Sequence, residues 1–293
     1  MNKNPYFITE PAVISFSGGR SSAYMLYKCI EAHNGKLPDY VKVCFANTGK
    51  EMPQTLDFVR DCGEQWGVDI VWLESNIKKN DDPNIKNKFL YRFDIVDYKT
   101  ASRNGEPFEY LLQVRQYLPN PVARFCTKDL KLTPMKKYMS GFFKDGYLNY
   151  IGIRGDELRR AAKLHNKVSE GNMCFLPMFV DGVTKQTIFK FWSNMDFDLQ
   201  LHNNNGTTDF GNCDLCFLKG YSKKLSIIRE MPHLADWWAR MEKQSPLRDS
   251  FVNSTATFRK DQPNYEQMKI IATDQGNLFD LPDDETIPCF CGD

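Results

Sequence analysis

The segment Val13–Met25, VISFSGGRSSAYM, constrains the fold of this chain more than any other stretch. Apolar residues run up to Phe16, a turn of serine and glycine follows, and Ala23, Met25 and Leu26 resume an apolar pattern. The pattern predicts a buried strand that passes through a tight turn directly into a helix. Because backbone N–H groups are exposed at a helix N-terminus and the peptide dipoles add up there, such a turn is suited to bind an anion.

The alternation of strand and helix continues beyond this segment. The runs Val41–Ala46 and Val68–Leu73 are β-rich, whereas Ser21–Ala32 and Thr55–Trp66 carry apolar residues at helical spacing. Strands that alternate with helices through short connections predict an α/β fold, a Rossmann-like parallel sheet covered by helices. Such a sheet binds ligands beyond the carboxyl ends of its strands, where the serine-glycine turn and the later turn Asn47-Thr48-Gly49 are both expected.

The pattern of predicted secondary structure changes at about residue 195. Before it we predict helices over Phe108–Tyr117 and Leu130–Phe143, a strand over Tyr147–Ile153, and a polar surface segment over Asn76–Asn87. After it, HNNNGTTDFGNCDLC is typical of a loop, and Lys223–Lys243 is predicted to be helical. We expect an anion-binding α/β domain over residues 1–195, and a smaller cysteine-containing region of helices and loops over residues 196–293.

Charge and hydropathy exclude several classes of partner. The 38 Lys and Arg nearly balance the 37 Asp and Glu, giving a net charge of +1, so a nucleic acid would have to be held by a local patch. No apolar run approaches the roughly 18 residues of a membrane span, and the N-terminal MNKNPYFITEPA lacks the apolar core of a secretory signal. We therefore expect a cytoplasmic protein with no membrane partner, whose nine cysteines are thiols or metal ligands rather than disulfides.

The serine-glycine turn is neither a Walker A loop nor a G-x-G-x-x-G dinucleotide motif, since the residues that these motifs require are missing. It still offers hydroxyl and N–H groups to phosphate oxygens. Arg154 and Arg124 are candidate phosphate clamps, because a guanidinium is always charged and binds in a bidentate manner.

Four segments together resemble the phosphoadenosine phosphosulfate (PAPS) reductase-like family. SGGRSS resembles the pyrophosphate (PP) loop of the adenine-nucleotide hydrolase-like superfamily, to which this family belongs. NTGKEMPQTLDF resembles an aspartate-threonine-glycine turn of the family, with Asn47 in place of the aspartate. RFCTKDLKLTPM resembles the family's cysteine segment, which runs to a lysine and a proline. IGIRGDELRRA resembles the end of a strand that is followed by arginines. Order and spacing agree over about Val13–Ala162. The whole string is most similar to the phage and prophage branch, which implies the cytoplasm of a bacterium or of a phage-infected host cell.

The resemblance implies an adenine nucleotide, either ATP with Mg²⁺ or a sulfonucleotide (PAPS or APS). Ser21 stands where adenylating members of the superfamily carry an aspartate, which weakens the expectation of Mg²⁺. The candidate nucleotide-binding residues are Ser15, Ser17, Gly18, Gly19, Arg20, Ser21, Ser22, Asn47, Thr48, Gly49, Gly152 and Arg154.

The sequence Cys213-Asp-Leu-Cys216 is a CxxC, which lets two sulfurs reach one metal. From the residues alone, zinc, an iron–sulfur cluster, a redox dithiol and unrelated thiols all remain possible. In cluster-containing sulfonucleotide reductases, a paired-cysteine segment joins a later CxxC around a [4Fe-4S] cluster. The resemblance places Cys126 on the first cysteine of that pair and Thr127 on the second, so this chain supplies three of the four ligands.

The two cysteines near the C-terminus, Cys289 and Cys291, are candidates for the fourth ligand of the cluster. Either Cys289 or Cys291 closes the cluster, or one iron stays open to an exogenous sulfur; a structural zinc is the main rival. Nearby, we predict that Lys219, Lys223 and Lys224 line a solvated helix face rather than a nucleic acid site. Trp237 and Trp238 are predicted to be core residues.

Three functions follow from the resemblance. The favoured one is an enzyme that adenylates an acceptor with release of pyrophosphate, for sulfur transfer or a related modification. The second is a sulfonucleotide reductase that releases sulfite, with Cys291 as nucleophile and a thiol donor. The third is a non-catalytic nucleotide-binding module. The sequence leaves the acceptor open among a small molecule, a nucleotide, tRNA and DNA, and leaves open a sulfur-donor protein and a homodimer.

Overall fold

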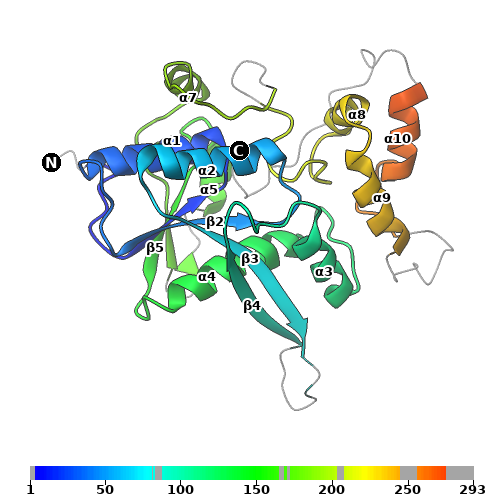
Figure 1. The fold of residues 1–293 in the computed structure, drawn as a ribbon, viewed down its shortest axis with the longest axis horizontal. Coiled ribbons are helices and arrows are strands. Elements are labelled where there is room, and N and C mark those ends of the chain that lie inside the picture. The colour runs from blue at the N-terminus through cyan, green and yellow to red at the C-terminus, as the bar shows by residue number, and fades with distance from the viewer. Residues whose placement is uncertain are drawn as a thin grey trace.

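The computed structural model describes residues 4–80, 82, 88–164, 168–169, 172–202, 208–244 and 256–274. In these ranges the chain forms a seven-stranded sheet in the order β4-β3-β2-β1-β5-β7-β6, with helices on both faces (Figure 1). The strands are β1 (Ala12–Phe16), β2 (Val41–Asn47), β3 (Ile70–Lys79), β4 (Phe89–Val96), β5 (Tyr147–Ile151), β6 (Val168–Ser169) and β7 (Asn172–Phe175). The predicted Rossmann-like α/β fold is confirmed.

The five inner strands are parallel, and only the two edge strands, β4 and β6, run antiparallel to their neighbours. The helices are α1 (Arg20–Ala32), α2 (Pro53–Trp66), α3 (Glu106–Arg115), the π-helix η1 (Thr127–Leu132), α4 (Thr133–Ser140), α5 (Leu158–Leu164), α6 (Pro177–Val180), α7 (Lys185–Trp192), α8 (Tyr221–Glu230), α9 (Leu234–Gln244) and α10 (Tyr265–Asp274).

The strand order creates a switch point next to β1. From β1 the chain proceeds outward through β2 and β3, and then returns to the other side of β1 as β5. Connections that leave neighbouring strands in different directions open a crevice at the strands' carboxyl ends. The residues after β1 and after β5 therefore meet at this crevice, as the sequence predicted for the serine-glycine turn.

Side chains alternate between two apolar layers. Ile14 and Phe45 belong to the main core with α1 and α2, whereas Val13 and Cys44 form a smaller cluster with Met139 of α4 on the opposite face. The period of two along each strand explains why both faces of the central strands are apolar.

Three predicted elements differ from the structure. Asn76–Lys79 is not a polar surface segment but the end of β3, which pairs with β4 in a hairpin; Asn80 and Asp82 follow, and the remainder of the predicted segment up to Asn87 is outside the described residues. The cause is a set of aromatic residues in β4 that favour a strand. The predicted helix Leu130–Phe143 begins earlier, as η1, and ends at Ser140. Lys223–Lys243 is two helices, because Pro232 lies between α8 and α9 and a proline ends a helix.

Helices α8, α9 and α10 lie together at one end of the molecule (Figure 1). Trp238 is fully buried there against Tyr265 and Phe258, and Trp237 is 7% exposed, so the prediction of two core tryptophans is confirmed. Within the described part of the chain, no helix is both long and apolar enough to cross a bilayer.

Candidate functional site

The turn between β1 and α1 is held open by its own serines. Gly18 has φ +78°, a backbone conformation that glycine adopts without strain. The Ser22 hydroxyl accepts from the Ser17 N–H at 3.2 Å, lies 2.9 Å from the Ser17 Oγ, and donates to the Gly19 carbonyl at 2.9 Å. Gly19 is the N-cap of α1 and supplies no side-chain cap, so the first-turn N–H groups keep the capacity to bind an anion.

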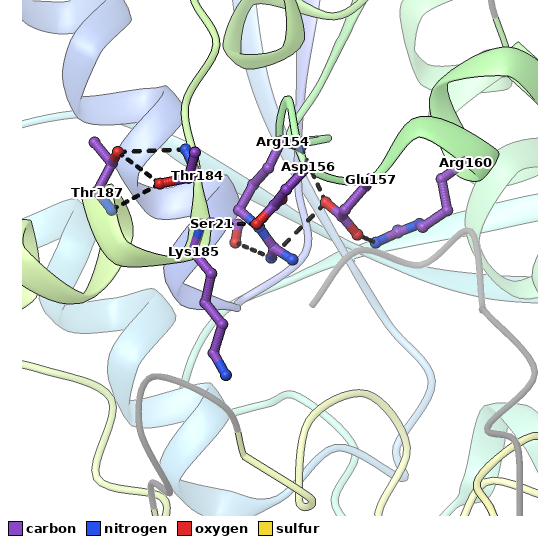
Figure 2. A network of polar contacts seen from close by, with 8 residues as sticks. All are labelled: Ser21, Arg154, Asp156, Glu157, Arg160, Thr184, Lys185 and Thr187. Atoms are coloured by element: carbon purple, nitrogen blue, oxygen red, sulfur yellow. Dashed lines mark hydrogen bonds and ion pairs between the residues drawn. The ribbon is translucent and has the colours of Figure 1, made fainter.

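Arg154 reaches this turn from the loop after β5. Its guanidinium donates to Ser21 Oγ at 3.2 Å and to Asp156 Oδ1 at 2.9 Å, and its backbone N–H donates to Glu157 at 2.9 Å (Figure 2). Burial alone would raise the pKa of Asp156, but the Lys185 N–H and Arg154 hold it below its usual value. The Asp156 carboxylate therefore stays charged and orients Arg154 toward the loop.

Lys185 is a second cation at this place, and sequence reasoning missed it. Thr184 caps α7 in a reciprocal capping box with Thr187, and the Lys185 N–H donates to Asp156 at 3.0 Å (Figure 2). Lys185 thereby lines the same cavity as the loop and Arg154. The signal in the sequence was Thr184, a good N-cap residue followed directly by a lysine.

This cavity, called the phosphate cavity below, contains no Asp or Glu in its described lining. The lining residues are Ser17, Gly18, Gly19, Arg20, Ser21, Thr55, Arg154, Lys185, Ile188, Leu199, Thr208, Gly211 and Asn212. The site is therefore built from cations, hydroxyls and backbone N–H groups, the chemistry that an anion requires. It offers no carboxylate ligand to Mg²⁺, which agrees with the presence of serine at position 21.

A second, mostly apolar cavity adjoins the first through Ser17 and is called the apolar cavity below. Its lining is Ser15, Phe16, Ser17, Ser22, Ala46, Thr127, Lys131, Leu132, Met135, Asn149, Ile151 and Gly152. Gly152 permits the close approach of β5 to α1, since a Cβ there would lie 3.0 Å from the Ser22 Cα. An apolar cavity beside an anion site suits a ligand with a planar apolar part and a charged part, such as a nucleotide.

Several predicted site residues have internal partners instead. The fully buried Asn47 amide donates to Glu74 at 2.6 Å and to the Ser102 carbonyl at 2.8 Å. A Cβ on Gly49, which has φ +76°, would lie 3.1 Å from the Gly105 backbone. The turn at Asn47 thus serves to pack the loop after β2, and neither residue lines the phosphate or the apolar cavity.

The two remaining predicted arginines are also engaged elsewhere. The Arg20 guanidinium binds Asp198 at 2.6 and 2.8 Å and donates to the Leu199 carbonyl at 2.6 Å, so it is a structural ion pair at the edge of the phosphate cavity. Arg124 donates to the Pro121 carbonyl at 2.8 Å and lines none of the cavities described here. Arg154 was a candidate from the sequence and lines the phosphate cavity. The sequence pattern did not indicate that Arg20 and Arg124 would be engaged elsewhere.

The CxxC lies beside the crevice although its sequence position is distant. Cys213 forms an isolated antiparallel bridge with Glu51, and the Lys50 ammonium binds Asp214 at 2.8 Å in a buried ion pair. As a result Thr48 Oγ1 lies 3.5 Å from the Cys213 Sγ. The loop after β2 therefore carries the CxxC to the carboxyl edge of the sheet.

Cys126, Cys213 and Cys216 line one cavity, together with Thr48, Phe108, Thr127, Leu130, Lys131, Asn212, Phe217 and Leu218. Thr127 and Lys131 also line the apolar cavity, and Asn212 also lines the phosphate cavity, so the three cavities adjoin. Burial and the Glu51 carboxylate hold the pKa of the Cys213 thiol well above its usual value, and Lys131 opposes this.

The donor set of three thiols suits a soft metal or an iron–sulfur cluster. Within the described residues, no three His, Cys, Asp or Glu side chains are grouped closely enough to hold a metal ion. The cysteine cavity measures about 20 Å³, room for about one water molecule. The chain thus fits a cluster in the kind of its ligands, whereas the three thiols are not grouped as a cluster requires and would have to rearrange around it. Cys289 and Cys291 lie outside the described residues.

We predicted that Lys219, Lys223 and Lys224 are exposed on a helix face, and this prediction is wrong for Lys219 and Lys224. Lys224 is fully buried, and burial lowers its pKa to about 8. Lys219 is 8% exposed and donates to the backbone carbonyls of Asp209 and Gly211. Lys219 thus holds the loop that carries the CxxC, whereas the Lys224 ammonium donates to the Gln262 side chain.

Comparison with known proteins places these observations in a family. The model of the phosphoadenosine phosphosulfate reductase domain matches residues 11–196. The uncharacterized nin region protein ORF290 of Escherichia phage lambda is 34% identical over 214 residues, 72% of this chain and 67% of that protein. The uncharacterized protein MJ0066 of Methanocaldococcus jannaschii is 29% identical over 163 residues, 55% of this chain and 27% of that protein.

Among solved structures, the U34-tRNA thiolase NcsA from Methanococcus maripaludis with its [4Fe-4S] cluster is similar at 14% identity. The match covers 97% of this chain and 81% of that one with a TM-score of 0.33, which is too low for residues of the two sites to be equated.

Proposed function

Since the chain belongs to the phosphoadenosine phosphosulfate reductase domain family, we propose that it is a PP-loop enzyme that binds ATP and adenylates an acceptor with release of pyrophosphate. The observation that carries this proposal is the junction of the phosphate cavity with the apolar cavity at the end of β1. The nucleoside would occupy the apolar cavity and the phosphates the loop from Ser17 to Ser22. Arg154, Lys185 and the N-terminus of α1, which has no side-chain cap, supply positive charge to the phosphates.

In the proposed reaction an acceptor oxygen attacks the α-phosphorus of ATP. The new bond joins that oxygen to the α-phosphorus, the bond to the bridging oxygen of the β-phosphate breaks, and pyrophosphate leaves with the electron pair. The proton of the acceptor oxygen passes to solvent. Arg154, Lys185 and the N–H groups of α1 would stabilise the negative charge that develops on the leaving pyrophosphate.

Cys126, Cys213 and Cys216 would hold an iron–sulfur cluster beside the same crevice. When bound, such a cluster supplies sulfur or electrons for the second half of the reaction. The protein's own contribution is position, because Thr127 and Lys131 line both the apolar cavity and the cysteine cavity. An acceptor activated at the border between the apolar cavity and the cysteine cavity would therefore lie next to the thiols.

Product analysis tests the proposal against sulfonucleotide reduction. We expect anaerobic protein to release pyrophosphate from ATP with candidate acceptors, to lose this activity in Arg154→Ala, and to keep it in Cys291→Ser. No sulfite should form from PAPS or APS. Thiol-dependent sulfite formation that Cys291→Ser abolishes would show that the chain is a reductase instead, since a reductase depends wholly on its nucleophilic thiolate.

Lys185→Ala is expected to weaken ATP binding by at least about tenfold, because a charge-assisted hydrogen bond contributes about 1.5–3 kcal/mol. Adenosine binding should not change, since Lys185 lines only the phosphate cavity. Calorimetric titration with ATP and with adenosine measures both. Lys190→Ala, an exposed lysine on the same helix, is the matched control and should bind ATP like the wild type. Equal weakening for ATP and adenosine would refute the placement of the phosphates.

A further inference from the structure

A wide groove between β4 and α4 lies outside the three cavities of the site. It has a volume of about 980 Å³. It is lined by Tyr91, Arg92, Phe93, Lys128, Thr133, Lys136, Lys137, Ser140 and Gly141, which come from β4, from η1 and from α4 and its end. Strand β4 is an edge strand of the sheet, and α4 lies beside it (Figure 1).

The groove is strongly basic although the whole chain carries a net charge of only +1. Four of its nine lining residues are Arg or Lys and none is acidic. The acidic residue of η1, Asp129, is fully buried and accepts from the Arg115 Nε at 2.9 Å, so it does not neutralise the groove. Four cations in a lining that includes no Asp or Glu form a local basic patch of the kind that a polyanion requires.

Aromatic and hydroxyl groups accompany the cations. Tyr91 and Phe93 are half-buried on the strand, and neighbouring side chains hold both rings. The Tyr91 hydroxyl accepts from Arg115 at 2.9 Å, and the Phe93 ring lies 6.0 Å from the Tyr138 ring, edge to face. Rings along a basic groove suit the bases of a single strand, since every base has a π-face. An acidic peptide would use the cations but not the rings.

The π-helix η1 connects the groove with the site. Thr127, Lys131 and Leu132 line the apolar cavity, whereas Lys128 and the next residue after η1, Thr133, line the groove. One helical segment thus separates the two, and a helix with its side chains is about 10–12 Å wide. π-helical turns are frequent at functional sites. A polymer in the groove therefore has one end or an unstacked base within reach of the border of the apolar cavity, where the α-phosphate of ATP would lie.

We propose that this groove binds a single-stranded nucleic acid and that the acceptor of the enzyme is a nucleotide within that strand. The phosphodiester backbone lies along Lys128, Lys136 and Lys137, and the bases face Tyr91 and Phe93. This inference rests on the proposed function for the reaction, but not for the binding itself.

The test is fluorescence anisotropy with a fluorescein-labelled single-stranded 20-nucleotide DNA of mixed sequence, titrated at 50 to 200 mM salt. Lys128→Glu/Lys137→Glu reverses two exposed charges of the groove, and Lys36→Glu/Lys99→Glu makes the same charge change at exposed lysines elsewhere. We expect the groove variant to bind at least about tenfold more weakly at 50 mM salt. The slope of the logarithm of the binding constant against the logarithm of the salt concentration should become about 1.4 less steep, because two phosphate contacts are lost. The control variant should bind within about twofold of the wild type.

Three results would each overturn the proposal. The groove variant could bind the oligonucleotide with wild-type affinity, or the control variant could lose as much affinity as the groove variant. Polyglutamate could also compete as strongly as unlabelled oligonucleotide. Thermal unfolding of both variants checks that they are folded. ATP titration of the same proteins separates the two proposals. Oligonucleotide binding without ATP binding would defeat the proposed function alone, whereas ATP binding without oligonucleotide binding would defeat the groove alone.

Discussion

Gly18→Ala is expected to reduce ATP binding by at least about tenfold and to lower the free energy of unfolding by about 1–3 kcal/mol. Two features of the structure give this result. Gly18 has φ +78°, a backbone conformation that is strained for a residue with a side chain. In addition, a Cβ at this position would lie 2.7 Å from the Thr55 Cγ2 methyl and 3.1 Å from the Val59 Cγ2 methyl. The loop must therefore shift away from α2, and the first-turn N–H groups of α1 shift with it.

Calorimetric ATP titration and thermal unfolding measure the two effects. Gly67→Ala is the matched control, because Gly67 also has positive φ, +58°, but no atom lies within 4 Å of its added Cβ. The control should lose some stability and bind ATP like the wild type. If Gly18→Ala retained wild-type ATP affinity, the turn after β1 would not be the phosphate site.

Cys213→Ala/Cys216→Ala is expected to abolish iron binding. Anaerobically prepared wild-type protein should contain iron and acid-labile sulfide in near-equal amounts, since three thiols line one cavity and thiolates are the ligands that iron–sulfur clusters take. Removal of two of the three leaves too few ligands. Iron and sulfide analysis with the visible absorption spectrum measures the loss.

Cys62→Ala is the control for this pair of substitutions. Cys62 is fully buried in α2 within the apolar core, and burial raises the pKa of its thiol, so it behaves as a small apolar residue. It should keep the full iron and sulfide content. One zinc ion per chain without sulfide in the wild type would instead identify a structural zinc site.

Local pattern was sufficient for much of the sheet and for the loop. The strand that ends at Phe16, the turn at Gly18 and the helix from Arg20 follow from apolar periodicity and from a glycine, both properties of neighbouring residues. The same holds for Arg154, which directly follows a predicted strand. The hairpin of β3 and β4 was missed because its polar positions, such as Asn76, resemble a loop until the partner strand is known.

The amino-acid sequence by itself determined that the chain alternates strand and helix, that a glycine turn opens a helix after the first strand, and that a CxxC, Cys213-Asp-Leu-Cys216, lies in the later part of the chain. Only the tertiary structure decided which side chains face the crevice. Asn47 and Arg20 take internal partners, whereas Lys185 reaches the phosphate cavity. Thr48 and Cys213 meet although 165 residues separate them. Such contacts depend on the packing of the whole chain, and the periodicity of a short segment carries no information about them.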